Sequence, residues 1–218
     1  MRVIMVAVMT LCGRISPASI GSPEDRHLLE QLRLETDGSL LGAGSLREAD
    51  PEMRGPGGVL SPNRLRAIIT GSGNVPSQNK KIFCHGPRPL VFTSSAIREA
   101  LADKLAGMAE VVGVEEGIHG LSLHDIFNDM ARRGAASVLL EGGGILNYAA
   151  LAQGVVDEIS LTITPKLSGD RAASSLISGP APLGNPFQTL RLLSCERTEY
   201  DELICRYRVK PTSTKQST

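Results

Sequence analysis

The sequence predicts an α/β fold with a mainly parallel central sheet flanked by helices and an antiparallel edge at its C-terminal end. Short apolar runs alternate with helical patterns along most of the 218 residues, which is typical of β–α–β units. The first run, residues 1–9, is almost continuously apolar, as in a strand that is covered on both faces. Two later runs, 189–196 and 203–209, flank Tyr200 and Asp201 and predict a closing hairpin.

The first helix is predicted at residues 22–36. Ser22 is a typical N-cap, Pro23 suits the first helical position, and two acidic residues follow in the first turn. The helix should bury a stripe of four leucines against the sheet, and these are Leu28, Leu29, Leu32 and Leu34.

The rest of the chain is predicted to hold short elements separated by loops. Strands are expected at 38–42, 66–70, 82–84, 90–93, 110–114 and 156–165, and helices just after 43–45, at 95–105 and at 122–132. Loops are expected at 49–62 and 166–186, and residues 211–218 resemble a disordered polar tail. Because no internal boundary divides the chain, residues 1–210 are expected to form a single domain.

Residues 138–147, with the sequence VLLEGGGILN, are the most informative stretch. An apolar strand ends at Glu141, three glycines follow, and a helix is predicted at 145–153. The first N–H groups of such a helix have no partner within it, and glycine lets a phosphate approach the backbone, so the stretch suits an anion. Glu141 would lie at the carboxyl end of its strand, where open α/β sheets bind ligands. A tight turn whose glycines serve only packing remains the alternative.

The composition argues against nucleic-acid and membrane partners. Basic and acidic residues both number 23, so there is no basic excess, and aromatic residues are only 3% with no Trp for stacking on bases. The apolar start of about ten residues is roughly half of what a membrane span needs. The four cysteines form no C-x-x-C pair and have no histidine at zinc spacing, so we expect no metal site and a reduced cytoplasmic protein.

Three stretches occur in an order and spacing that resemble a known family. They are MTLCGRI at 9–15; Arg33 followed by TDG at 36–38, LGAGS at 41–45 and DP at 50–51; and LEGGGILN at 140–147 followed by VDE at 156–158 and TPK at 164–166. Together they resemble the riboflavin-biosynthesis reductases, which have a dihydrofolate-reductase-like fold, and the resemblance covers residues 3–209. Cys12 and Ala49 depart from it, since each stands where the family has an Asp.

The resemblance implies an NADPH-dependent reductase that converts a ribosylamino-pyrimidine 5′-phosphate to its ribitylamino form. Hydride would reach C1′ of the opened sugar, and the protein would supply orientation and a dry cleft. The resemblance also implies a homodimer. The deaminase that precedes the reductase in some members is not expected, because the sequence has no H-x-E or P-C-x-x-C motif.

The resemblance also assigns site residues. Cofactor contacts are implied at Val8, Ser45, Leu121, Gly142, Gly143, Gly144, Ile145, Leu146 and Asn147. Substrate contacts are implied at Arg33, Asp50 and Glu141, of which Glu141 is also the expected catalytic residue. The turn at 71–74 suits the 2′-phosphate of NADPH, although it contains no Arg.

Other interpretations stay open from the residues alone. Arg33 would suit a solvated helix face, and Ser45 would suit a helix cap. Glu141 is harder to explain as structural, because a carboxylate at the end of an apolar strand is costly unless it is hydrogen-bonded. The whole chain would also suit a dihydrofolate-reductase-like oxidoreductase with another small substrate, or a non-catalytic NADP-binding protein.

Overall fold

The computed structural model describes residues 1–15, 20–184 and 187–210, so the predicted tail at 211–218 lies outside the described residues. Its strands are β1 (Arg2–Thr10), β2 (Gly38–Gly42), β3 (Leu65–Ile69), β4 (Leu90–Ser94), β5 (Glu110–Val114), β6 (Glu116–Gly117), β7 (Gly120–Leu121), β8 (Ser137–Leu140), β9 (Glu158–Thr164), β10 (Leu190–Arg197) and β11 (Leu203–Val209). Its helices are α1 (Pro23–Leu34), α2 (Ala43–Glu48), α3 (Lys81–Cys84), α4 (Arg98–Lys104), α5 (Leu123–Arg132) and α6 (Gly144–Ala152), with 3₁₀ turns at Pro56–Gly58 and Ser95–Ile97.

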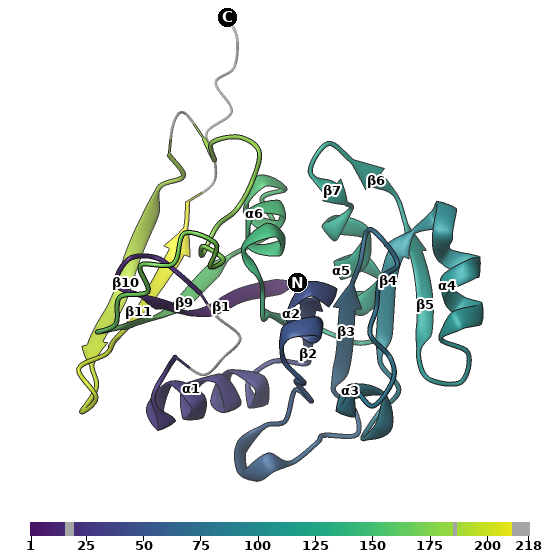
Figure 1. The fold of residues 1–218 in the computed structure, drawn as a ribbon, viewed down its shortest axis with the longest axis horizontal. Helices are drawn as coiled ribbons and strands as arrows, with labels where there is room; N and C mark the ends of the chain where they lie inside the picture. Colours follow the sequence, from purple (N-terminus) through teal and green to yellow (C-terminus); the bar gives the residue numbers. More distant parts are fainter. Residues whose placement is uncertain (16–19, 185–186, 211–218) are drawn as a thin grey trace, which may run out of the picture.

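Within the described ranges, nine strands form one sheet in the order β10-β11-β9-β1-β8-β2-β3-β4-β5. All neighbouring pairs from β9 to β5 are parallel. The C-terminal hairpin adds the two antiparallel strands β11 and β10 at one edge. In Figure 1 this hairpin lies at the left, and β4, β5 and α4 lie at the right. The predicted fold class is therefore confirmed.

Two faces of the sheet carry separate apolar cores because side chains alternate along each strand. Val3 and Met5 of β1 pack into the larger cluster, which includes buried residues of α5 and α6. Ile4, between them, faces the other side and packs with Leu32 of α1. A third apolar cluster lies on β2, β3 and β4, and the helices α2, α3 and α4 contribute residues to it. In the part of the chain that the structure describes, no helix is long and apolar enough to cross a membrane.

Two local predictions were wrong, and one small element was not predicted. Residues 82–84 were expected as a strand but belong to α3, where the Asp50 carboxylate accepts a hydrogen bond from the Lys81 N–H at 2.9 Å. Three apolar residues are too few to separate a strand from a helical turn. Leu34 was expected to be buried, but its side chain is 69% exposed. The buried face of α1 contains Leu32 and Arg33, and Leu34 lies outside this face at the end of the helix. The small β6–β7 ribbon was not predicted.

The predicted start of α1 is confirmed, and it is tied to the C-terminal hairpin. The Ser22 hydroxyl accepts hydrogen bonds from the N–H groups of Glu24 and Asp25. The same hydroxyl donates to the Glu202 carboxylate at 2.7 Å, and the Ser22 N–H donates to that carboxylate at 2.8 Å. Glu202 lies next to β11 and is only 2% exposed. Ser22 therefore caps the helix and satisfies a buried carboxylate at once.

Replacing Ser22 should cost more than an ordinary helix cap. In Ser22→Ala the helix loses its cap and Glu202 loses a donor, so we expect the free energy of unfolding in urea to fall by about 2–4 kcal/mol. Ser122→Ala is the matched control, because Ser122 caps α5 through the Asp125 N–H, and no bond from its hydroxyl to a carboxylate is found among the described residues. That variant should lose about 1 kcal/mol. Equal losses in the two variants would show that the bond to Glu202 contributes nothing.

Candidate active site

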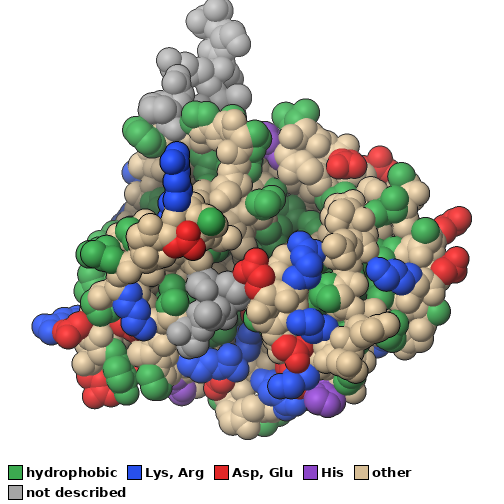
Figure 2. All heavy atoms as spheres, viewed as in Figure 1, with side chains coloured by type: hydrophobic (Ala, Val, Ile, Leu, Met, Phe, Trp, Pro, Cys, Tyr) green, Lys and Arg blue, Asp and Glu red, His purple; other side chains and the backbone are tan. Residues whose placement is uncertain are grey.

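A cleft of about 1090 Å³ opens at the carboxyl ends of four neighbouring strands, β1, β8, β2 and β3. Ligands in open α/β sheets bind at such strand ends. Figure 2 shows acidic and basic side chains intermixed on this side of the molecule rather than gathered by sign. The cleft is lined by all twelve residues that the sequence singled out, which are Val8, Arg33, Ser45, Asp50, Leu121, Glu141, Gly142, Gly143, Gly144, Ile145, Leu146 and Asn147.

The three glycines lie where the backbone is closely crowded. A Cβ on Gly142 would collide with the Asn147 side chain, and one on Gly144 would collide with the Ser175 carbonyl oxygen. Gly143 has φ +150°, a conformation that other residues rarely adopt. Close packing thus requires glycine here, and the packing interpretation of the motif is correct as far as it goes.

The same turn also leaves the start of α6 open to the cleft. Among the described residues no side chain caps this helix, and its first residues line the cleft wall. Unpaired N–H groups and the helix dipole favour an anion at this place. Ser45, at the start of α2, donates a hydrogen bond to the Gly142 carbonyl at 2.8 Å and so holds the turn against α2. Anion binding and packing are therefore compatible functions of one motif.

Arg33 and Glu141 bind each other beneath the cleft. The guanidinium Nε lies 2.9 Å from one carboxylate oxygen and Nη2 lies 2.5 Å from the other, which is the two-point geometry that favours Arg. Their side chains are only 4% and 7% exposed. Nη1 of Arg33 donates to the Arg54 carbonyl at 2.9 Å. The sequence implied two separate substrate contacts, whereas the structure joins the two groups.

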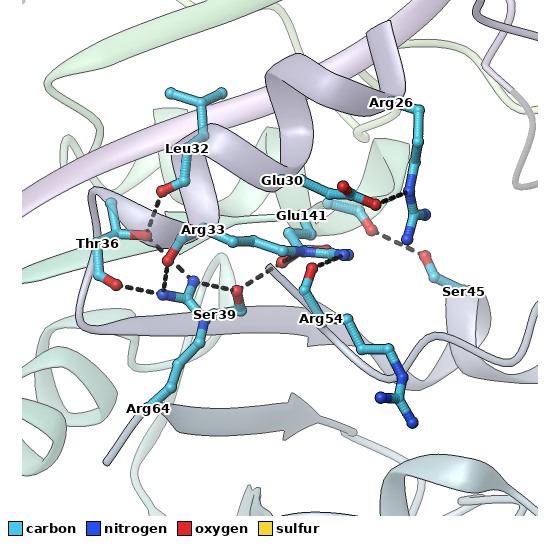
Figure 3. Close-up of polar contacts among 11 residues, drawn as sticks. Arg26, Glu30, Leu32, Arg33, Thr36, Ser39, Ser45, Arg54, Arg64 and Glu141 are labelled. Atoms are coloured by element: carbon cyan, nitrogen blue, oxygen red, sulfur yellow. Dashed lines mark hydrogen bonds and ion pairs between the residues drawn. The ribbon is translucent and has the colours of Figure 1, made fainter. Parts of the chain in front are cut away.

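Two further residues complete this network, and Figure 3 shows their positions around the pair. The Ser39 hydroxyl donates to Glu141 at 2.5 Å, and Arg64 donates to the Ser39 hydroxyl at 2.6 Å. Arg64 also donates to Thr36 at 3.1 Å and to the carbonyls of Arg33 and Thr36. The sequence analysis missed both residues, although a Ser inside the buried run GSLLG was an available signal.

The network keeps Glu141 ionised. Burial alone would raise the pKa of this carboxyl, but the charge of Arg33 and the hydrogen bonds from Arg33 and Ser39 outweigh it and hold the pKa below its ordinary value. Burial likewise opposes the charge on Arg33, and Glu141 raises its pKa in compensation. The floor of the cleft is thus a desolvated but balanced pair of charges.

The side chains of the remaining predicted residues differ in how far they are exposed to the cleft. Ile145 is 78% exposed at the cleft, whereas Leu121 and Leu146 are buried in its wall. Asn147 is fully buried, and its amide donates to the Leu176 carbonyl at 2.9 Å. One oxygen of Asp50 accepts the Lys81 N–H, as described above. Asn147 and Asp50 therefore also hold the segments that form the cleft.

An arginine reaches the turn at 71–74 from another element. Arg47 of α2 donates to the Asn74 carbonyl at 2.8 Å, and both Arg47 and Ser72 line the cleft. The turn itself contains no Arg, and the proximity of α2 to the end of β3 supplies one. Within the ranges that the structure describes, no group of three or more metal-ligating side chains is present.

Comparison with known proteins identifies relatives over nearly the whole chain. The family model described as "RibD C-terminal domain" matches residues 1–204. The 2,5-diamino-6-ribosylamino-4(3H)-pyrimidinone 5′-phosphate reductase of Methanothermobacter thermautotrophicus is 30% identical over 215 residues, which cover 95% of this chain and 98% of that protein.

Solved structures share the fold at lower identity. RibD of Acinetobacter baumannii superposes with a TM-score of 0.78 at 18% identity, over 96% of this chain and 58% of the RibD chain. Dihydrofolate reductase from Enterococcus faecalis superposes with a TM-score of 0.53 at 12% identity, over 96% of both chains. The chain therefore has a dihydrofolate-reductase-like fold and belongs to the RibD C-terminal domain family, the pyrimidine reductases of riboflavin biosynthesis.

Proposed function

We propose that this protein uses NADPH to reduce a ribosylamino-pyrimidine 5′-phosphate to its ribitylamino form. The observation that carries the proposal is that one cleft gathers twelve residues from well-separated stretches at the carboxyl ends of parallel strands. Its volume of about 1090 Å³ lies just above the usual range for small-ligand sites, as expected for a cofactor and a substrate together.

The cofactor end of the cleft lies at the start of α6. Gly143 and Gly144 present backbone without a Cβ, and the N–H groups that follow suit the phosphates of a dinucleotide. Ser45 holds this turn in place, and Val8 and Leu121 give the cleft apolar wall. When bound, the nicotinamide supplies the hydride, and the protein contributes orientation and exclusion of water.

The substrate end lies over α1 and the end of β8. Because Glu141 occupies the guanidinium fork of Arg33, we propose that the two act together as a charged, rigid floor for the sugar and pyrimidine. Other arginines in the cleft have guanidinium groups suited to the 5′-phosphate, and they are Arg14, Arg26 and Arg171.

We propose that Arg47 sets the preference for NADPH over NADH. It lines the cleft beside Ser72 at the turn after β3, so that turn combines a cation, a hydroxyl and backbone N–H groups. This combination matches a phosphate monoester and gives no advantage to an unmodified ribose.

We also propose a homodimer that uses the edge of the sheet. In the part of the chain that the structure describes, strand β10 has no neighbour on its outer side. Three of its leucines are unusually exposed, with Leu190 at 36%, Leu192 at 53% and Leu193 at 40%. The apolar start of the strand, residues 190–193, is expected to be covered in solution, whereas Cys195 lies beyond the bulge between Leu192 and Ser194 and stays accessible.

Turnover should depend on the charge of Glu141. With either the diamino- or the aminouracil-type ribosyl phosphate, we expect the wild type to oxidise NADPH. The reaction is measured as the loss of NADPH absorbance. Glu141→Gln removes the charge that orients Arg33, so kcat/KM should fall on the order of 10²-fold. The variant should still bind NADPH, because the open helix terminus is unchanged.

Glu110→Gln is the control for this experiment. Glu110 also pairs with an arginine through both oxygens, at 3.0 and 2.5 Å from Arg133, but it lies on β5 away from the cleft. Its kcat/KM should stay within about twofold of the wild type. Absence of turnover with both substrates in a wild type that binds NADPH would refute the reductase assignment and favour a binding protein.

Cofactor selectivity should depend on Arg47. In Arg47→Gln the KM for NADPH is expected to rise about tenfold through loss of one charge-assisted contact, while the KM for NADH stays the same. Arg132→Gln is the control, because its side chain is 71% exposed and lies at the end of α5. Equal changes for NADPH and NADH would place Arg47 outside the 2′-phosphate site.

A further inference from the structure

Two cysteines face each other in the C-terminal hairpin. Cys195 of β10 and Cys205 of β11 are direct cross-strand partners. Their sulfur atoms are in contact, with the Cys205 thiol donating to Cys195 at 3.2 Å. Cys205 is 3% exposed, whereas Cys195 is exposed to solvent.

The register of the hairpin suits a covalent bond between them. Close to the turn, the Thr198 N–H donates to the Glu202 carbonyl at 2.9 Å. Hydrogen-bonded and non-hydrogen-bonded pairs alternate along an antiparallel ladder, so counting three positions from this pair makes Cys195 and Cys205 a non-hydrogen-bonded pair. Such pairs have Cα atoms about 4.5 Å apart, within the range that a disulfide spans.

The surroundings favour a disulfide over a metal ion. Two thiols alone leave a soft metal short of ligands, and the described residues contain no group of three or more ligating side chains. The other two cysteines lie on different segments, with Cys12 after β1 and Cys84 at the end of α3. The hairpin therefore holds one pair of thiols in contact, and one member of the pair is accessible.

We propose that Cys195 and Cys205 form a reversible disulfide under oxidising conditions. A disulfide oxidant such as oxidised glutathione supplies the electron acceptor. The exposed Cys195 thiolate attacks one glutathione sulfur, which forms a mixed disulfide and releases one reduced glutathione. Cys205 then attacks the Cys195 sulfur, its proton leaves with the second glutathione, and both electrons have passed to the oxidant. Burial and, to a smaller extent, the contact with Cys195 raise the pKa of the Cys205 thiol. This agrees with Cys195 being the thiol that reacts first.

The disulfide would add a covalent link to a row of paired residues that crosses neighbouring strands of the sheet toward the cleft. Cys205 pairs with Leu161 of β9, and Leu161 pairs with Ala7 of β1, which lines the cleft. Since the thiols already touch, oxidation requires little movement of this row. We therefore expect the oxidised protein to keep its cleft and to resist heat better than the reduced protein.

The test uses a variant in which Cys12 and Cys84 are both replaced by Ser, so that only the pair remains. Both replaced residues are exposed, and the fold should tolerate the change. After treatment with oxidised glutathione, the intact mass should fall by two hydrogen atoms and both thiols should become unreactive in denaturant. Dithiothreitol should restore both thiols. The melting temperature should be higher in the oxidised form, and a non-reducing gel should show a single chain.

A third substitution in the same variant separates the steps. With Cys205→Ser added, Cys195 should retain one glutathione as a stable mixed disulfide. With Cys195→Ser added instead, the buried Cys205 should stay free over the same time. The proposal is overturned if the two-cysteine variant also keeps glutathione on Cys195, if both thiols stay free, or if the gel shows two chains joined by a disulfide.

Discussion

The arrangement of the site depends on one buried ion pair between Arg33 and Glu141. Removing both charges from water costs several kcal/mol for each ion, so the pair is tolerated only because its geometry is good and its remaining groups are bonded. The two-point contact, the Ser39 hydroxyl and the Arg54 carbonyl meet these conditions. As a result, α1 is held against the carboxyl end of β8, at the place where the cleft opens.

The glycine turn continues directly from this pair. Glu141 is followed at once by Gly142, whose carbonyl binds Ser45, so the ion pair, the turn and α2 form one connected unit. Each glycine is required by a neighbour that leaves no room for a Cβ, or by its backbone conformation. The start of α6 follows Gly142 and Gly143 directly and lines the cleft. Close packing and the approach of a ligand therefore both favour glycine at these positions.

Local signals predicted much of the fold. Ser22 and Pro23 marked the start of α1, and the apolar run before three glycines marked β8 and α6. Signals of this kind act within a few residues. Residues 82–84 were too few to choose between strand and helix, and the β6–β7 ribbon was too short for any period to emerge.

The residues that line the cleft were predictable as a set, but the contacts among them were not. The resemblance to the family selected twelve residues, and all of them line one cleft. It could not reveal that Arg33 and Glu141, which are 108 residues apart, bind each other instead of standing free. It also could not predict that Arg47 contacts the turn after β3, or that Arg64 donates to the Ser39 hydroxyl. Those contacts depend on how helices dock on the sheet, and no local pattern encodes that.

A double-mutant cycle tests the central claim most directly. Arg33→Met and Glu141→Leu would be compared singly and together, with the free energy of unfolding and kcat/KM measured for each. Each single variant leaves a buried charge unpaired and should lose about 3–5 kcal/mol of stability. The double variant should lose less than the sum by roughly 1–3 kcal/mol, and it should still lack activity. Additive losses of stability, or a double variant with normal kcat/KM, would contradict the account.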